Sequence, residues 1–236
     1  MTHRGLPPII PEPTEHSLGL VEGGGTMGET RKRAAILAVA SRLFAEKGYA
    51  NTPTSEIARE AGVAEGTLYH HFGSKDGIFL AIYNETVDGY IAGVENLIGH
   101  GKNGRDSMLG LIRHHFDYLQ AHEPQFLTML RDFPERVGRR KTSSATARRK
   151  KLGRLNELMT AIVERGAADG SLRLRFPARD TAEMLRGILY GTTRHRMLGI
   201  IDVPLARLAE MLADFCRHAL APPAAQGKEL QGGKNH

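Results

Sequence analysis

The chain of 236 residues has one cysteine, a formal net charge of +6 and a pI near 9.6. The positive charge favours a polyanionic partner, with nucleic acid as the first candidate and an anionic membrane surface as the second. A lone cysteine excludes an internal disulfide framework and a cysteine-rich metal site, and it predicts a cytoplasmic protein. No apolar run approaches the roughly 18 to 20 residues of a membrane helix, so we expect a soluble protein. Of the two candidate partners we favour nucleic acid and expect no membrane partner.

The two ends of the chain are polar and rich in glycine. Residues 1–28 contain Gly23-Gly24-Gly25 and too few apolar side chains to offset the entropy of ordering them. The final residues, from 222 to 236, have the same character. We therefore predict a disordered N-terminal arm over 1–28 and a disordered tail over 222–236.

Between these ends, apolar residues recur at helical spacing, and glycine or proline stands at most breaks. Only Ser171 to Phe176, SLRLRF, alternates like a strand, and a lone strand has nothing to pair with. The pattern predicts an all-α fold. The expected helices are 30–47, 52–61, 65–71, 75–98, 105–121, 124–137, 142–168, 179–199 and 204–219.

The stretch SEIAREAGVAEGTLYHHFGS, residues 55–74, contains two short amphipathic segments separated by Ala61-Gly62-Val63. Thr52-Pro53 supplies a start signal for the first segment, with the threonine hydroxyl placed to cap a free N–H group. Gly62 suits the turn between the segments, and Ser74 is expected to cap the following helix. Two helices joined by such a turn form a helix-turn-helix, whose second helix can enter the major groove of DNA.

In this arrangement apolar side chains fill a small core and polar ones face outward. The expected core is Ile57, Ala58, Ala61, Val63, Leu68 and Phe72. The outward set is Glu65, Gly66, Thr67, Tyr69, His70 and His71, residues that are mostly hydrogen-bonders of the kind that contact phosphate. The alternative is an ordinary helical hairpin in which Tyr69 packs half-buried and the histidines lie on the surface.

From about Thr30 to Tyr83 the chain resembles the N-terminal domain of the TetR (tetracycline repressor) family of bacterial transcription regulators. The ordered run AGVAEGTLYHHFGSKDGIFLAI carries most of the resemblance. The resemblance as a whole covers under a third of the chain, and the rest of the chain matches the family only in its all-helical layout. The resemblance implies a three-helix helix-turn-helix DNA-binding domain, here residues 29–74, and a larger helical ligand-binding and dimerisation domain, here residues 75–221.

The resemblance also implies roles for individual residues. Thr52 and Thr67 would bind backbone phosphates, and Tyr69 and His70 would contact phosphate or base edges. Lys75 would meet a phosphate at the N-terminus of the fourth helix, where the helix dipole favours an anion. The expected DNA-binding set is therefore Thr52, Glu65, Gly66, Thr67, Tyr69, His70 and Lys75.

Two positions depart from the usual pattern of the family. Ala64 stands where such proteins often have serine, which forfeits a helix cap worth on the order of 1 kcal/mol. Glu65 would repel a phosphate, yet its carboxylate can accept a hydrogen bond from the N4 amino group of cytosine. Glu65 therefore either reads a base or is a helix N-terminal charge that faces solvent.

The family resemblance implies a two-fold dimer that releases DNA when it binds a small molecule. Such a dimer would reach half-sites about 34 to 36 Å apart in a palindromic operator. The last two helices carry apolar residues that suit a four-helix dimer seam, and Gly187 and Gly191 would permit close approach. A plain intrachain core is the alternative. The residues concerned are Met184, Leu185, Ile188, Leu205, Leu208, Leu212 and Phe215.

The larger domain is rich in aromatic and methionine side chains, which favours a lipophilic or flat ligand. The expected ligand-binding residues are Tyr90, Leu111, His115, Tyr118, Phe126, Met129, Leu130, Phe133 and Met159. A basic cluster lies between two of the expected helices, either as a solvated charge run or as a site for the phosphates of an acyl-CoA-like ligand. It consists of Arg136, Arg139, Arg140, Lys141, Arg148, Arg149, Lys150, Lys151 and Arg154.

Enzymatic and metal-binding functions find little support. The spacing of His114, His115 and His122 does not give the usual i, i+4 pair of ligands, and no GxxxxGK[ST], HExxH or GxSxG motif occurs. We expect no catalytic residues, no metal and no cofactor. Two rival functions are an all-helical carrier or enzyme with a merely structural helix-turn-helix, and a non-specific architectural DNA binder. Salt-dependent DNA affinity would count against the first, and high sequence specificity against the second.

Overall fold

The computed structural model describes residues 27–136 and 143–222, with side chains described over 28–132 and 146–222. The predicted N-terminal arm and tail lie outside these residues, except that the first helix already begins at Met27. The described helices are α1 (Met27–Lys47), α2 (Thr54–Glu60), α3 (Glu65–Phe72), α4 (Lys75–His100), α5 (Gly104–Ala121), α6 (Glu123–Arg136), α7 (Ser143–Ala168), α8 (Ala178–Met197) and α9 (Leu205–Ala219).

The all-α prediction is confirmed, since no strand occurs in the part of the chain that the structure describes. The alternating segment 171–176 connects α7 to α8 instead. Its Leu172 is buried in the core, and the backbone N–H of Arg173 donates to the carbonyl of Leu220 at 2.9 Å. The segment thus binds the C-terminus of α9 by a single backbone contact and does not build a sheet.

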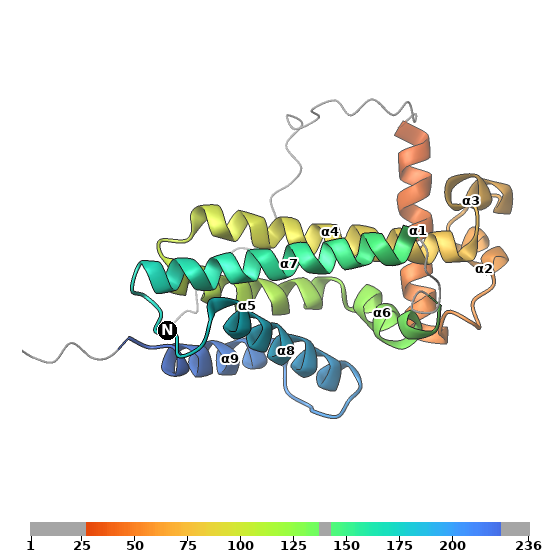
Figure 1. The fold of residues 1–236 in the computed structure, drawn as a ribbon. Coiled ribbons are helices and arrows are strands. Elements are labelled where there is room, and N and C mark those ends of the chain that lie inside the picture. Colours follow the sequence, from red (N-terminus) through yellow and green to blue (C-terminus); the bar gives the residue numbers. More distant parts are fainter. Residues whose placement is uncertain (1–26, 137–142, 223–236) are drawn as a thin grey trace, which may run out of the picture.

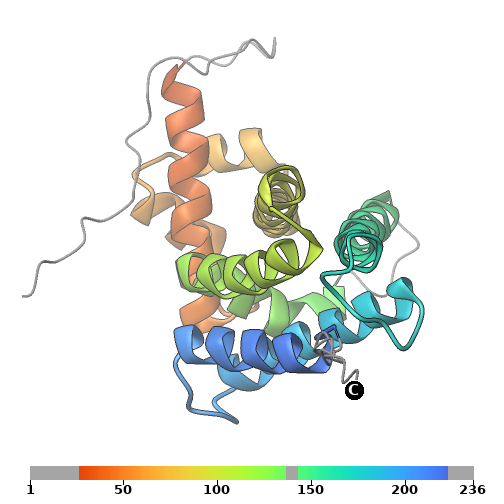
Figure 2. The same cartoon turned by 90° about the vertical axis from the view of Figure 1, so that its left-hand side faces the viewer.

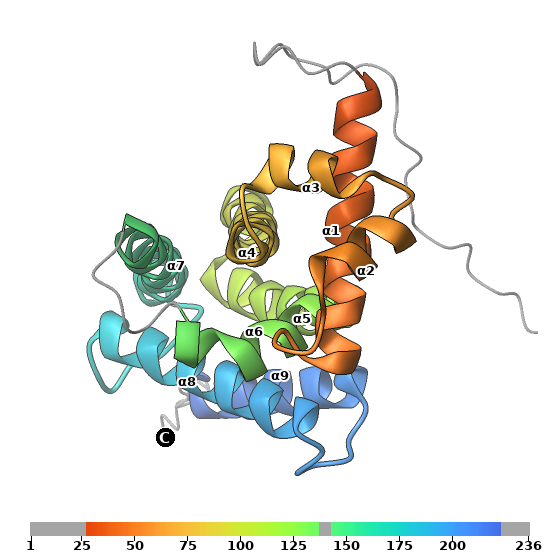
Figure 3. The ribbon, with the colours of Figure 1, turned by 90° about the vertical axis from the view of Figure 1, so that its right-hand side faces the viewer.

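Two hydrophobic cores share the long helix α4. The smaller core contains Ile36, Phe44, Ile57 and Leu68 from α1, α2 and α3, packed around Ile78 of α4. Figures 1 and 3 show these three helices gathered around the N-terminal end of α4. The smaller core therefore places α2 and α3 at one end of the molecule.

The larger core lies around the C-terminal half of α4. Val94 of α4, Leu111 of α5, Ile162 of α7, Leu189 of α8 and Leu212 of α9 all contribute to it. The helices pair as α4 with α5 and α7, α5 with α9, and α7 with α8. Figure 2 shows α9 running beneath α5 along one edge of this domain.

The C-terminal end of α7 packs directly on the start of α5. A methyl group added to Gly104 would lie 2.0 Å from the backbone nitrogen of Gly166, which is far inside van der Waals contact. The first N–H groups of α5 are also bound here, since that of Gly104 donates to Asp169 at 2.7 Å and that of Arg105 to Ser171 at 3.0 Å. Asp169 accepts hydrogen bonds from the Ser171 hydroxyl and from the backbone N–H groups of Gly104 and Ser171, and these bonds lower its pKa.

We predict that Gly104→Ala destabilises the fold, because the methyl group can be accommodated only by moving α7 away from α5. Overpacking of this kind costs about 1 to 3 kcal/mol in chemical denaturation. Gly153→Ala on α7 is the matched control, since a methyl group there meets nothing within 4 Å. Because alanine is the better helix former, the control should be neutral or slightly stabilising. Equal stability of the two variants would contradict this packing.

Candidate functional site

The turn between α2 and α3 fixes the position of α3. Gly62 has φ +68°, in the left-handed region that glycine adopts without strain, and the N–H of Val63 donates to the carbonyl of Ala58 at 3.0 Å. Leu68 at the centre of α3 is fully buried against α1 and α2. One face of α3 is thereby anchored, and the opposite face is left to the surface.

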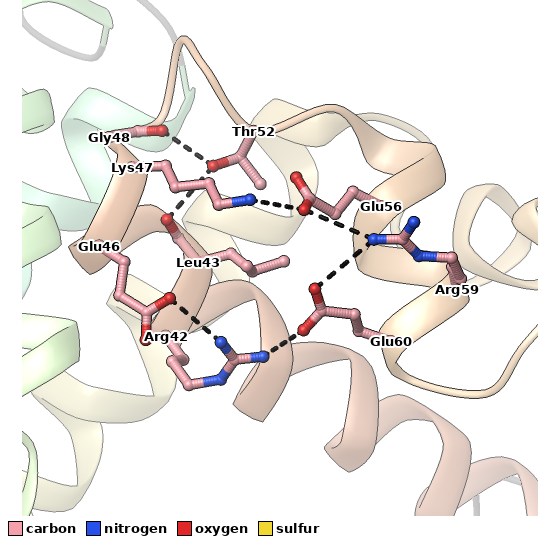
Figure 4. A network of polar contacts seen from close by, with 9 residues as sticks. All are labelled: Arg42, Leu43, Glu46, Lys47, Gly48, Thr52, Glu56, Arg59 and Glu60. Atoms are coloured by element: carbon pink, nitrogen blue, oxygen red, sulfur yellow. Dashed lines mark hydrogen bonds and ion pairs between the residues drawn. The ribbon is translucent and has the colours of Figure 1, made fainter.

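A network of charged side chains braces α2 against α1 (Figure 4). Arg42 of α1 bridges Glu46 and Glu60, while Lys47 donates to Glu56 at 2.6 Å. The bond from Lys47 is the main cause of the lowered pKa of Glu56. Pairs exposed to solvent contribute little energy each, so the network fixes the orientation of α2 more than it stabilises the fold.

The outward face of α3 carries most of the predicted DNA-binding residues. Glu65, Gly66, Tyr69 and His70 are exposed, and Thr67 is half-buried. A methyl group at Gly66 would meet nothing within 4 Å, so this stretch of backbone is open to close approach by a partner. The short helix α3 thus exposes the polar side chains of Glu65, Tyr69 and His70, together with the backbone at Gly66.

Thr54, at the start of α2, joins two of these side chains. Its hydroxyl donates to Glu65 Oε1 at 2.8 Å and lies 3.0 Å from the hydroxyl of Tyr69. Because the Thr54 proton goes to the carboxylate, Tyr69 must be the donor in the second bond. The remaining lone pairs of Tyr69 and the second oxygen of Glu65 are therefore acceptors. Sequence reasoning missed Thr54, since no periodicity relates it to residues 11 and 15 positions later.

The structure corrects the prediction for Thr52. This residue is fully buried, and its hydroxyl lies 2.9 Å from the carbonyl oxygen of Gly48, to which it donates. It neither caps α2, which begins after Pro53, nor can it reach a phosphate in this conformation. Its hydroxyl is used instead to hold the loop between α1 and α2 together.

The start of α4 lies beside α3. The prediction that Ser74 caps α4 is confirmed, since its hydroxyl accepts the N–H of Gly77 at 3.0 Å. Ala64 offers α3 no such bond, as expected for alanine. The ammonium group of Lys75 lies 4.5 Å from the centre of the Tyr49 ring and 3.4 Å from the carbonyl of Ala50. This places a cation at the N-terminus of α4, at the edge of the α3 surface.

Comparison with known proteins agrees with this geometry. Residues 36–82 match the model of the bacterial regulatory proteins of the tetR family. The N-terminal part of the chain is thus similar to the DNA-binding domain of the TetR family. The HTH-type transcriptional repressor KstR2 of Rhodococcus jostii is 29% identical over 152 residues, which cover 63% of this chain and 71% of that protein.

Two further relatives show how far the similarity reaches. The HTH-type transcriptional activator FasR of Mycolicibacterium smegmatis is 30% identical over 102 residues, 43% of this chain, and the match spans only 46% of FasR. The structure of FadR from Bacillus subtilis in complex with stearoyl-CoA superposes with a TM-score of 0.66 at 21% identity, covering 78% of this chain and 96% of FadR. At that identity the superposition shows the fold alone.

In the larger domain, the predicted ligand-binding residues fall into two groups. Tyr90, Leu111, His115 and Met159 are buried in the larger core, which Phe126 borders. Tyr118, Met129 and Leu130 are half-buried, and the side chain of Phe133 lies outside the described residues. The larger core and its border thus bring together Tyr90, Leu111, His115, Tyr118, Phe126 and Met159.

A hydrogen-bonded chain runs through this interior from α4 to α8. The hydroxyl of Tyr90 lies 3.0 Å from Nδ1 of His115, and Nε2 of His115 lies 2.7 Å from the hydroxyl of Thr193. Burial, with a smaller contribution from the neighbouring His114, lowers the pKa of His115 to about 4. Burial also raises the pKa of Tyr90. Both groups are therefore neutral at pH 7, and each ring nitrogen of His115 has a hydroxyl partner.

Aromatic side chains of α5 pack into two glycine positions on α4. A methyl group at Gly89 would lie 2.4 Å from the Tyr118 hydroxyl oxygen, and one at Gly93 would lie 2.1 Å from the His114 ring. The hydroxyl of Tyr118 donates to the carbonyl of Thr86 at 2.9 Å, and His114 Nε2 lies 3.1 Å from the carbonyl of Tyr90. Tyr118 and His114 thus hold α4 in one register against α5.

Within the described residues, no three His, Cys, Asp or Glu side chains are grouped closely enough to hold a metal ion. His114 and His122 bond to backbone carbonyls of α4 and α5, and the ring of His122 stacks on Tyr118 with centroids 3.9 Å apart. Over the same residues, none of the helices is both long enough and apolar enough to cross a membrane.

The basic cluster is only partly available to a ligand. Lys151 pairs with Asp88 at 2.7 Å, and Arg154 pairs with Glu95 at 2.9 Å, so both residues join α7 to α4. Arg149 and Lys150 are exposed. Arg136, Arg139, Arg140 and Lys141 have side chains outside the described residues. Lys151 and Arg154 already have acidic partners, which counts against the phosphate-site alternative at these two positions.

The apolar residues of α8 and α9 divide between two faces. Leu185, Leu208 and Leu212 are buried in the core of the chain, whereas Met184 and Phe215 are 61% and 58% exposed. Ile188 is also exposed, and methyl groups at Gly187 and Gly191 would meet nothing. Between the two helices lies an apolar groove of about 190 Å³, with Arg173 and Arg175 in its lining. The predicted seam residues thus serve both alternatives, some as intrachain core and some as an outer face.

The buried state of His115 predicts a pH dependence of stability. The folded protein keeps this ring neutral down to about pH 4, whereas the unfolded chain protonates it near pH 6.5. Because the unfolded state binds more protons in that window, stability falls as the pH is lowered from about 6.5 towards 4, by on the order of 3 kcal/mol.

Denaturation of wild type and His115→Gln between pH 4.5 and 7 tests this prediction. The variant should lose the part of the slope that comes from residue 115, whatever its stability at pH 7. His218→Gln, which replaces an exposed histidine of α9, is the matched control and should keep the wild-type slope. Parallel pH profiles for wild type and His115→Gln would show that the ring is not held neutral.

Proposed function

We propose that this chain is a transcriptional repressor that binds a palindromic operator as a homodimer and is released by a lipophilic small molecule. The observation that carries the proposal is the polar face of α3, held outward by Leu68 and edged by Lys75. Residues 29–74 would bind DNA, and residues 75–221 would bind the effector and a second copy. The protein would act in the cytoplasm, without catalytic activity or a cofactor.

The acceptor character of the α3 face favours a contact with bases over phosphates at two positions. Glu65 and Tyr69 present oxygen lone pairs outward because Thr54 takes up one oxygen of Glu65 and the proton of Tyr69. Such acceptors repel a phosphate and match the amino groups of cytosine N4 or adenine N6 in the major groove. Gly66, Thr67, His70 and Lys75 would then supply the backbone contacts that fix the register.

The interior of the larger domain suits an uncharged, largely apolar effector region. Three of its polar groups, Tyr90, His115 and Thr193, are neutral and linked by hydrogen bonds through His115. On α6, the Thr128 hydroxyl and the Gln125 amide oxygen are buried, and neither has a hydrogen-bond partner among the described residues. These two groups, three residues apart on one helix face, could bind polar atoms of an effector. The stearoyl-CoA held by FadR makes a fatty acyl-CoA the first probe.

The outer face of α8 and α9 supports homodimerisation through these helices. Met184, Ile188, Met211 and Phe215 are large apolar side chains exposed on this face. A patch of this kind on one protein commonly marks an interaction surface. A second copy would cover it and place two α3 helices on the same face of a duplex.

Selection from a random duplex pool tests the DNA-binding proposal directly. We expect enrichment of a palindrome of about 15 to 20 base pairs, bound roughly a thousandfold or more above non-specific DNA. Glu65→Gln and Thr54→Val should relax the preference at one symmetric pair of positions, each by a factor of about ten. Ser55→Ala, at the exposed neighbour of Thr54, is the control. No enrichment for wild type would favour a carrier or a non-specific binder.

The effector proposal is tested with oleoyl-CoA as the probe and free coenzyme A as the control. Binding at about one hundred times Kd should stabilise the fold by roughly 2.7 kcal/mol in a thermal shift assay. Oleoyl-CoA should also release the selected operator, and coenzyme A alone should do neither. Stabilisation by neither compound, with no release of DNA, would exclude an acyl-CoA effector while leaving the operator result intact.

A further inference from the structure

The end of α1 is completed by two side chains of α6. α1 ends at Lys47, and Gly48 turns the chain away with φ +81°. A continuing helix would bond the N–H of Tyr49 to the carbonyl of Ala45. Instead, the N–H of Tyr49 donates to Asp132 Oδ2 at 3.1 Å, and the carbonyl of Ala45 accepts Arg131 Nη1 at 2.9 Å. The donor and the acceptor that would have formed the next helical hydrogen bond are thus each bound by a side chain of α6, and the two side chains are consecutive in sequence.

Tyr49 connects this contact to the core beneath α3. Its ring is buried, 5.1 Å from the ring of Phe44 and 5.7 Å edge-on from that of Phe79. Its hydroxyl donates to Asp76 in the first turn of α4. A shift of Asp132 would therefore move the backbone of a residue whose side chain is fixed at the junction of α1 and α4.

The position of α6 makes this a contact between the two domains. α6 packs along the lower end of α1, as Figures 1 and 3 show, and it also contacts α4 and α5. Phe126 of α6 borders the larger core, and the Thr128 hydroxyl on the same helix is buried with no hydrogen-bond partner among the described residues. A rearrangement around that interior thus has a direct polar route to α1.

We propose that Arg131 and Asp132 are positioning residues that fix the angle of the DNA-binding domain against the larger domain. In a dimer this angle sets the separation of the two α3 helices, and hence the half-site spacing that the protein accepts. The part that concerns spacing rests on the proposed function. The part that concerns the angle does not require DNA or a dimer.

The angle is measured first, in the DNA-free protein. Spin labels on Gly66→Cys and Gly153→Cys, in a Cys216→Ala background, report the distance from α3 to α7 within one chain, with labelled chains diluted in unlabelled ones. Both sites are open to solvent. The parent should give one narrow distance distribution, and Asp132→Ala and Arg131→Ala should broaden or shift it. Asp132→Asn and Arg131→Lys keep an acceptor and a donor and should restore the narrow distribution.

The matched controls are Arg113→Ala and Asp117→Ala, which remove the same residue types from exposed positions on α5. They should leave the distribution unchanged. Distributions for Asp132→Ala and Arg131→Ala that coincide with the parent would overturn the proposal, whatever the protein does with DNA. A loss of thermal stability without a change in distance would mean that the pair only stabilises α1, and would also overturn it.

Spacing is measured next, with the selected half-sites placed at separations that differ by single base pairs. Wild type should prefer one spacing over its neighbours by about tenfold, because adjacent spacings rotate the half-sites around the duplex. Asp132→Ala and Arg131→Ala should reduce this preference to about twofold, with base preference within a half-site unchanged. An unchanged spacing preference despite a broadened distance would overturn the spacing part. Absence of any preferred spacing in wild type would instead count against the proposed dimeric operator reader.

Discussion

The structure depends on α4 being buried at both ends in different cores. Ile78, Phe79 and Ile82 belong to the small core with α1, α2 and α3, while Ile91 and Val94 belong to the large one. α4 runs without a break between these two sets of residues. One continuous helix therefore contributes both to the core beneath α3 and to the interior that contains His115. Burying roughly one and a half turns of apolar surface at each end makes separation of the domains costly. In the described part of the chain, α4 and α6 provide the main contacts between the first three helices and the helices of the larger core.

Much of the fold could be predicted because apolar residues recur at helical spacing, and glycine, proline or capping residues mark the helix ends. The expected and observed helix ends differ by no more than a few residues, and Gly62 and Ser74 have the local roles that their chemistry suggested. The prediction that the Thr52 hydroxyl caps α2 and binds a phosphate was wrong for a reason that the sequence does not show. Thr52 and Thr54 flank the same proline, and by residue type both could cap a helix. Only the packing of the loop shows that one hydroxyl faces inward and the other faces α3.

The candidate sites were harder to predict, because their meaning depends on partners distant in the chain. Lys151 and Arg154 look like a free basic run in the sequence, yet acidic residues of α4 neutralise them. Nothing near Asp132 in sequence indicates that its carboxylate would bind the N–H of Tyr49, 83 residues away. The apolar residues of α8 and α9 occupy two faces of each helix, and periodicity cannot tell which face packs against the same chain.

The seating of Tyr118 and His114 in the glycine positions of α4 has a mechanical consequence. Side chains inserted at Gly89 and Gly93 obstruct sliding along the axis and leave tilting as the easier motion, with this point as the fulcrum. Lys75 lies about 14 residues away, or about 21 Å at 1.5 Å per residue. On that lever arm, a tilt of about 5° moves the start of α4, and α3 with it, by roughly 2 Å. A small adjustment inside the larger domain is thereby magnified at the end of α4 that carries α3.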